Sequence, residues 1–203
     1  MKMFAPTFAL LMALSLPAQA GGQLYEEMSA SVRAALSKAV SDTPVSNSVV
    51  LTDSAGRAWL AEMSKRLVKR FPDDGQRMDF LKTAYYEATR AGLDPELVLG
   101  LIEVESGFKK YAVSSVAARG YMQVMPFWTK TIGTSDDDLF HLRTNLRYGC
   151  NILRLYVNIE HGDLYRALGR YNGSLGKPEY PNMVLAAWKK HWTYMPNAEI
   201  ASK

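Results

Sequence analysis

Residues 94–126 read DPELVLGLIEVESGFKKYAVSSVAARGYMQVMP and carry the strongest structural signals in the chain. The first of these residues predict the start of a helix. The Asp94 side chain can accept free backbone N–H groups, and Pro95 suits the first helical position. Gly107 is typical of a left-handed cap at a helix end. The sequence therefore predicts a helix of about three turns between these residues.

This helix carries a carboxyl group among aliphatic side chains. At about 100° per residue, Val98, Ile102 and Glu105 share one face, and Gly100 and Glu103 fall on the other. Burial and the negative end of the helix dipole both disfavour an ionised Glu105, so we expect its pKa to be raised. A carboxyl that is protonated near neutral pH can donate its proton, as glycosidic bond cleavage requires. By periodicity alone, however, a Glu in the last helical turn is more often solvated.

Short motifs around Glu105 favour the chemical interpretation. In chain order they are ESGF at 105–108, SS at 114–115, GYMQ at 120–123, MP at 125–126 and YN at 171–172. This ordered set resembles the catalytic core of the SLT-type lytic transglycosylases, lysozyme-like enzymes that cleave peptidoglycan. The resemblance covers about residues 94–192. The chain departs from the family pattern at Ser115, Ala117 and Tyr121, which affects the shape of the sugar subsites and leaves Glu105 in place.

The resemblance implies a peptidoglycan lytic transglycosylase that acts on the β-1,4 bond between N-acetylmuramic acid and N-acetylglucosamine. Glu105 is then the catalytic residue: it protonates the glycosidic oxygen and later takes a proton from the sugar O6 hydroxyl. The substrate's own 2-acetamido group assists, and O6 closes a 1,6-anhydro ring. This chemistry needs no protein nucleophile, metal or cofactor, and none is predicted.

The resemblance also implies a set of substrate-binding residues, namely Ser106, Ser114, Gln123, Met125, Tyr171, Asn172 and Tyr180. Ser114 corresponds to a family Ser that contacts the N-acetyl group, although a loop cap explains a Ser there equally well. Gln123 offers a donor and an acceptor to sugar groups. Tyr171 corresponds to the family Tyr whose hydroxyl lies close to the catalytic Glu. Tyr180 preserves the spacing of a further family motif, whereas aligning residues 178–179 instead would preserve its Glu.

We predict a mostly α, lysozyme-like helical domain with a catalytic cleft. Small residues at 112–120 allow a small β-hairpin at the cleft wall, and extra helices precede the core. The predicted organisation is a signal peptide (1–20), an N-terminal arm or linker with some helical character (21–52), a transglycosylase domain (53–194) and a polar tail (195–203). The catalytic core of the domain is residues 94–192.

The first residues have the features of a secretory signal peptide. Lys2 precedes an apolar run from Phe4 to Leu16, and residues 18–20 read Ala-Gln-Ala, a small-x-small cleavage site. An uncleaved anchor is the alternative, but the apolar run is short for a bilayer span of about 20 residues. We expect cleavage after Ala20, export to a bacterial periplasm or beyond, and no membrane span afterwards.

The amino-acid composition limits the kinds of binding partner that the sequence predicts. The net charge of +4 is a mild excess that favours an anionic polymer such as peptidoglycan. No basic stripe with interleaved aromatic residues is present, so we do not predict nucleic acid as a partner. The single cysteine, Cys150, excludes an intramolecular disulfide and is best read as a small core residue. The sequence leaves the oligomeric state open.

Two other functions remain compatible with the sequence. A muramidase like goose-type lysozyme would use water as the nucleophile, usually held by an additional carboxylate. The run Asp136–Asp138 could reach the cleft, although a solvated loop is the simpler interpretation. A non-catalytic peptidoglycan-binding factor is the second alternative, and the presence of Glu105, Gln123 and Tyr171 argues against it.

Overall fold

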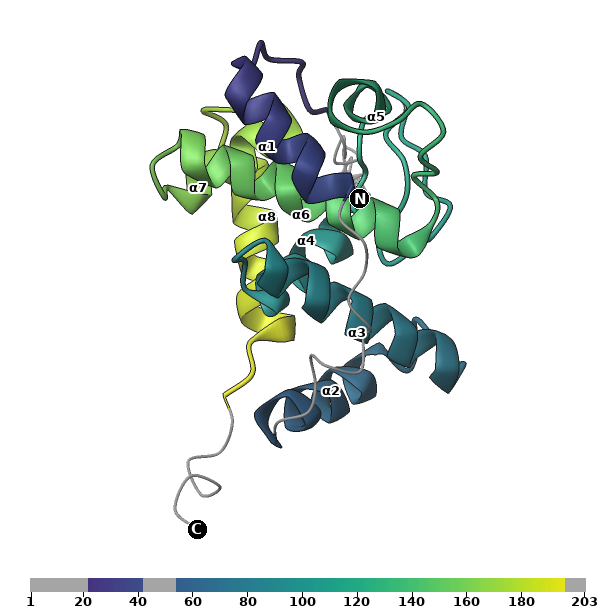
Figure 1. Cartoon of the computed structure of the whole chain (residues 1–203). Helices are drawn as coiled ribbons and strands as arrows, with labels where there is room; N and C mark the ends of the chain where they lie inside the picture. The colour runs from purple at the N-terminus through teal and green to yellow at the C-terminus, as the bar shows by residue number, and fades with distance from the viewer. Residues whose placement is uncertain (1–21, 42–53, 196–203) are drawn as a thin grey trace, which may run out of the picture.

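The computed structural model describes residues 22–41 and 54–195 (Figure 1). The predicted signal peptide, much of the segment that follows α1 and the last residues of the tail lie outside this part of the chain. None of the helices in the described ranges is long and apolar enough to cross a membrane.

The described chain is mostly α, which confirms the predicted fold class. The helices are α1 (Ala30–Ser41), α2 (Ser54–Leu67), α3 (Asp74–Arg90), α4 (Pro95–Ser106), α5 (Phe127–Ile132), α6 (Leu142–Ile159), α7 (Leu164–Asn172) and α8 (Glu179–Ala187), with a short π-helix at Trp188–Trp192. Within residues 22–41 and 54–195, β structure is limited to two antiparallel bridges, Val113 with Arg119 and Arg119 with Val124. These bridges lie where the sequence predicts a small hairpin.

Helix α4 begins and ends where its sequence predicts. Asp94 accepts hydrogen bonds from the backbone N–H groups of residues 96 and 97, and Pro95 occupies the first turn. Gly107 closes the helix in the left-handed conformation, with φ 57°. Its amide donates to the Glu103 carbonyl, so one of the free carbonyls at the helix end is satisfied.

Helix α4 is buried on both of its sides. Residues 97–102 are all buried, and α4 lies near the centre of the molecule (Figure 1). Gly100, on the side opposite Glu105, faces the π-helix so closely that a Cβ there would lie 2.8 Å from the Trp188 nitrogen. The final turns of the chain therefore cover the second face of α4, and only a glycine allows this approach.

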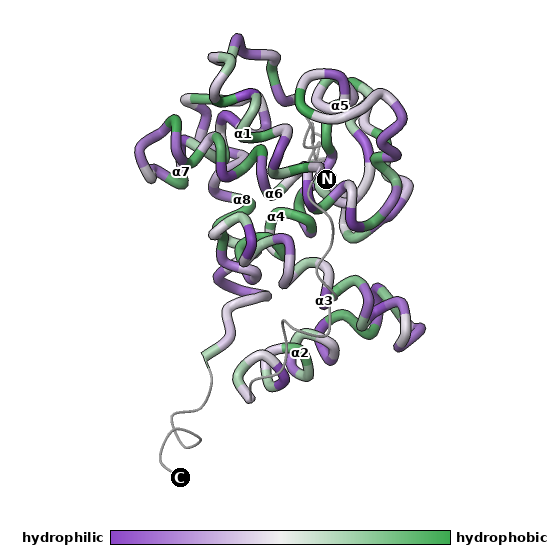
Figure 2. The backbone as a smooth tube through the Cα atoms, in the orientation of Figure 1, coloured by the Kyte–Doolittle hydropathy of each residue, from purple (hydrophilic) through white to green (hydrophobic). Residues whose placement is uncertain are grey.

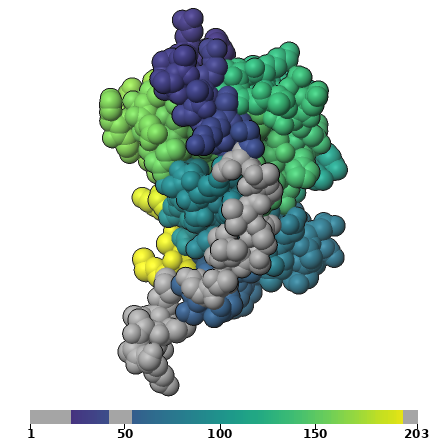
Figure 3. All heavy atoms as spheres, viewed as in Figure 1, coloured from purple at the N-terminus to yellow at the C-terminus, as the bar shows by residue number. Residues whose placement is uncertain are grey.

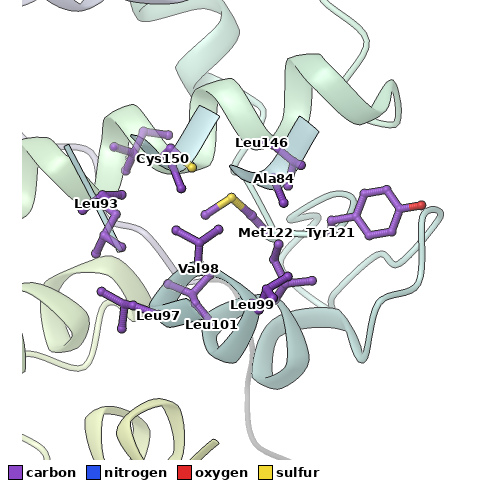
Figure 4. Close-up of a cluster of buried hydrophobic side chains, with 14 of the residues drawn as sticks. Ala84, Leu93, Leu97, Val98, Leu99, Leu101, Tyr121, Met122, Leu146 and Cys150 are labelled. Atoms are coloured by element: carbon purple, nitrogen blue, oxygen red, sulfur yellow. The ribbon is translucent and has the colours of Figure 1, made fainter. Parts of the chain in front are cut away.

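The core around α4 joins residues far apart in the sequence. Figure 4 shows Val98 and Leu101 of α4 with Met122, Leu146 and Cys150, all of them fully buried. Cys150 is thus a core residue, as predicted. The hydropathy colouring in Figure 2 shows α4 as a largely hydrophobic stretch, in agreement with a helix that is covered on all sides.

Residues N-terminal to the core pack onto it. Helix α1 buries Leu36 and Val40, and it contacts α5 and α6. The Arg90 guanidinium donates to the Ala39 carbonyl, and Arg147 donates to the Val40 carbonyl. In Figure 3, α1 (purple) lies along the upper surface of the molecule. This part of the predicted arm is therefore an ordered helix of the folded body.

Candidate active site

Glu105 lies in the last turn of α4 and is only 5% exposed. Its Oε1 accepts a hydrogen bond of 2.5 Å from the Tyr180 hydroxyl, which comes from the first turn of α8. Its Oε2 is buried and has no hydrogen-bond partner in the described part of the chain. One oxygen of this carboxyl is thus held in place, and the other is left for a further contact.

Burial raises the pKa of Glu105 to about 8, and the hydrogen bond from Tyr180 opposes this rise. The direction agrees with the expectation from the sequence. Because the pKa lies above neutral pH, the carboxyl holds a proton at pH 7. Such a group can donate a proton to a leaving oxygen and accept one afterwards.

The hydroxyl that bonds to Glu105 is that of Tyr180, whereas the resemblance implied that the Tyr171 hydroxyl lies close to it. The Tyr171 hydroxyl donates to the Met122 carbonyl at 2.7 Å. The hydroxyl bonded to Glu105 belongs to Tyr180, because α8 packs along α4 whereas the end of α7 points its side chain at the loop before α5. Burial raises the pKa of Tyr171, and the nearby charge of Glu105 adds to this effect, so both tyrosines lie near the carboxyl.

The Gln123 side chain holds a loop. It is 2% exposed, and its amide donates to the carbonyls of Ala112 at 3.1 Å and Gly120 at 3.0 Å. Its backbone has φ 48°, an uncommon value for a residue other than glycine. Both amide donors therefore fix the turn at 120–123, where the sequence predicts contacts to sugar groups.

Asn145 is a site-supporting residue that the motifs did not reveal. It is fully buried on α6, and its Oδ1 accepts from the Met122 N–H at 2.8 Å. Its Nδ2 donates to the carbonyls of Arg119 and Leu139, both at 2.8 Å. The sequence feature that could have indicated its role is a polar residue directly before Leu146, on a helix with a strong apolar face.

The two predicted serines bond within their own segments. The Ser106 hydroxyl donates to the Ile102 carbonyl at 3.2 Å. The Ser114 hydroxyl accepts from the backbone N–H groups of Val116 and Ala118 at 3.3 and 3.1 Å. Ser114 thus caps a loop here, the alternative that the sequence left open.

Met125 lies in the loop before α5, and Asn172 is the last residue of α7. Met125 is half-buried, and its backbone N–H donates to the side chain of Gln23 at 3.0 Å. Asn172 donates to the Ser174 hydroxyl at 3.1 Å, and its Oδ1 is buried without a partner among the described residues. Asn172 therefore retains one acceptor for a further contact.

Other nearby carboxylates have structural partners. Glu103 accepts from the Trp192 indole N–H at 2.7 Å, and Glu96 accepts from the Tyr194 N–H at 2.9 Å. Both carboxylates therefore hold residues 192–194 against α4. Asp137 accepts from the Tyr148 hydroxyl and lines a cavity of about 600 Å³ beside α1 and α6. That cavity is lined by none of the predicted substrate-binding residues.

Across residues 22–41 and 54–195, no group of three His, Cys, Asp or Glu side chains is arranged to hold a metal ion.

The model of the transglycosylase SLT domain family matches residues 82–181. Over 86 residues the chain is 41% identical to the membrane-bound lytic murein transglycosylase C of Actinobacillus pleuropneumoniae serotype 5b, a stretch that covers 41% of this chain and 22% of that protein. Over 88 residues it is 32% identical to the transglycosylase of Enterobacteria phage PRD1, covering 43% of this chain and 32% of that protein. The chain thus spans between about a fifth and a third of the length of these relatives.

Proposed function

We propose that this chain, whose residues 82–181 match the model of the transglycosylase SLT domain family, acts as a peptidoglycan lytic transglycosylase. It would cleave the β-1,4 bond between N-acetylmuramic acid and N-acetylglucosamine. The observation that carries this proposal is the buried Glu105 carboxyl with a pKa of about 8, held by Tyr180 at one oxygen.

In the proposed reaction, Glu105 first protonates the glycosidic oxygen, and the bond from that oxygen to C1 breaks. The carbonyl oxygen of the substrate's 2-acetamido group bonds to C1 and balances the positive charge. The Glu105 carboxylate then takes the proton of the O6 hydroxyl. O6 bonds to C1, the acetamido oxygen leaves, and a 1,6-anhydro ring forms. Glu105 ends protonated, ready for another cycle.

The surrounding residues support this one carboxyl. The Tyr180 hydroxyl donates to Oε1 and stabilises the carboxylate form that the second step needs. Gln123 and Tyr171 fix the loop between Ala112 and Val124 and so shape the cleft. We propose that Met125 and Asn172 contact the sugars, with Ser106 and Ser114 supporting the walls.

We propose an envelope location for the enzyme. The amino-terminal sequence has the features of a signal peptide cleaved after Ala20, which would release the chain into the periplasm or outside the cell. The relatives from Actinobacillus carry the name of membrane-bound murein enzymes.

The test is mass spectrometry of the soluble products after residues 21–203 are incubated with purified sacculi. We expect fragments that end in 1,6-anhydro-N-acetylmuramic acid and resist borohydride reduction. Reducible ends would instead establish hydrolysis, the muramidase alternative. Bound sacculi without any fragments would establish a binding factor. Glu105→Gln is the matched control, because it keeps the size of the side chain and cannot donate or accept the catalytic proton.

A further inference from the structure

Residues 22–29, here called the N-terminal strap, precede α1 and lie against the loops of the proposed cleft. In Figure 1 the purple segment before α1 starts beside α5. Gly22 touches the end of α7: a Cβ on Gly22 would lie 2.7 Å from the Asn172 carbonyl oxygen. A Cβ on Gly173 would in turn lie 2.1 Å from the Gly22 oxygen. The two backbones are therefore in direct contact, which glycine alone permits at both positions.

Gln23 ties the strap to the other loop of the cleft. Its Nε2 donates to the Gln123 carbonyl at 3.1 Å, and its Oε1 accepts from the Met125 N–H at 3.0 Å. Gln23 is only 3% exposed, an unusual degree of burial for a glutamine. The strap thus bridges the Met125 loop and the end of α7 at Asn172, the two places where we propose sugar contacts.

Further contacts add to the attachment. The Tyr25 ring meets the Phe127 ring edge-on, with centroids 5.8 Å apart. The Glu26 carboxylate pairs with Arg170 of α7 at 2.6 Å. Tyr25 is 58% exposed, and the partly buried Met28 packs against the core. Release of the strap has to break these few contacts and the two hydrogen bonds of Gln23, and none of them lies within the helices of the core.

We propose that the N-terminal strap is autoinhibitory: it lies in the path of the glycan and must leave before substrate binds. This inference rests on the proposed function, because the cleft is the one that serves Glu105. The Gln123 carbonyl and the Met125 N–H offer one acceptor and one donor, which suit the acetamido and hydroxyl groups of an N-acetylated sugar. In the strapped state the Gln23 carboxamide occupies both.

This proposal predicts the sign of a mutational effect. A glycan binds only the fraction of molecules whose strap has left, so weakening the strap raises the apparent affinity. If Gln23 instead merely supports the Met125 loop, removing its side chain weakens glycan binding. The two interpretations therefore make opposite predictions for the same variant.

The experiment measures binding of tri-N-acetylchitotriose to the mature chain by titration calorimetry. We expect Gln23→Ala to bind about tenfold more tightly than the wild type, since two hydrogen bonds that hold the strap are lost. Gln76→Ala, an exposed glutamine on α3, is the control and should bind like the wild type. Unchanged or weaker binding by Gln23→Ala would overturn the proposal.

A second variant guards against damage from replacing a buried residue. Glu26→Gln removes the charge that pairs with Arg170, and Glu27→Gln makes the same change at the exposed neighbouring position. We expect about threefold tighter binding for Glu26→Gln and no change for Glu27→Gln. Thermal unfolding of both variants would show that each is folded. Equal affinities for these two variants would contradict autoinhibition by the strap.

Digestion of sacculi distinguishes a failure of the strap proposal from a failure of the proposed function. Anhydro fragments from every variant, with no gain in affinity, would contradict autoinhibition by the strap and support the proposed reaction. Tighter binding by Gln23→Ala and Glu26→Gln without any anhydro product would contradict the proposed reaction and support autoinhibition by the strap. We expect both tighter binding and faster release of anhydro fragments.

Discussion

The Tyr180 hydroxyl donates a 2.5 Å hydrogen bond to Oε1 of Glu105, joining the first turn of α8 to the last turn of α4. Burial of Glu105 favours its protonated form, and this hydrogen bond favours the carboxylate. The two effects oppose each other and leave a pKa of about 8. A carboxyl balanced in this way suits a reaction in which it acts first as an acid and then as a base.

Tyr180→Phe should slow the reaction by roughly 10- to 100-fold, since a hydrogen bond to a charged carboxylate is lost. The pKa of Glu105 should rise further, because burial is then unopposed. The measurement is the rate of anhydro-product release between pH 5 and 10. We expect the basic limb of the profile to move to higher pH in the variant. Tyr86→Phe, at a half-buried tyrosine of α3, is the control and should match the wild type.

The wild-type activity should fall as pH rises through about 8, because the first step needs protonated Glu105. Below that pH the carboxyl is protonated, and its titration imposes no further loss. About one pH unit above the pKa, the rate should be roughly a tenth of its maximum. The measurement is kcat/KM on a soluble peptidoglycan fragment. A rate that increases through this range would contradict Glu105 as the acid.

Glu105→Gln should abolish activity and stabilise the fold at neutral pH. Between pH 4.5, the ordinary pKa of a Glu side chain, and about pH 8, Glu105 is ionised in the unfolded chain and protonated in the folded one. The unfolded state then binds fewer protons, so the free energy of unfolding falls as pH rises through this window. At pH 7 this costs about 3 kcal/mol, which a neutral amide avoids. Urea unfolding at pH 5 and pH 8 measures the difference: the wild type should lose stability between them, and the variant should lose much less.

Asn145→Ala should destabilise the protein by about 3 kcal/mol and lower its activity. The side chain is fully buried and bonds to the backbone at Met122, Arg119 and Leu139, and its loss leaves those groups without their partner. Asn151→Ala on the same helix is the control, because its side chain donates only to the Arg147 carbonyl within α6. Denaturant unfolding of both variants gives the comparison. Equal losses would show that the loop does not depend on Asn145.

Local sequence predicted the elements that carry the site. The ends of α4 follow from Asp94 and Gly107, whose capping hydrogen bonds involve neighbours a few residues away. The helical period places Glu105 on the same face as Val98 and Ile102. Such features depend on periodicity and short-range bonds, and those are present in the sequence itself.

The contacts that complete the site are between residues far apart in the chain. Periodicity could not indicate that Tyr180 rather than Tyr171 reaches Glu105, because this depends on how α7 and α8 pack against the rest. Nor could it show that Gln123 bonds to its own loop, since an amide can serve either a sugar or the backbone.

The sequence thus predicted the helices of the core, the place of Glu105 on α4 and a resemblance that suggests a reaction. Tertiary structure decided which side chains surround that acid and that Gln23 lies 100 residues from the loop it binds. The physical reason is that helix formation and capping use neighbouring groups, whereas burial and the bonds across a cleft depend on the packing of the whole chain. Packing covered both faces of α4, raised the pKa of Glu105 and placed the strap over the loops of the proposed cleft.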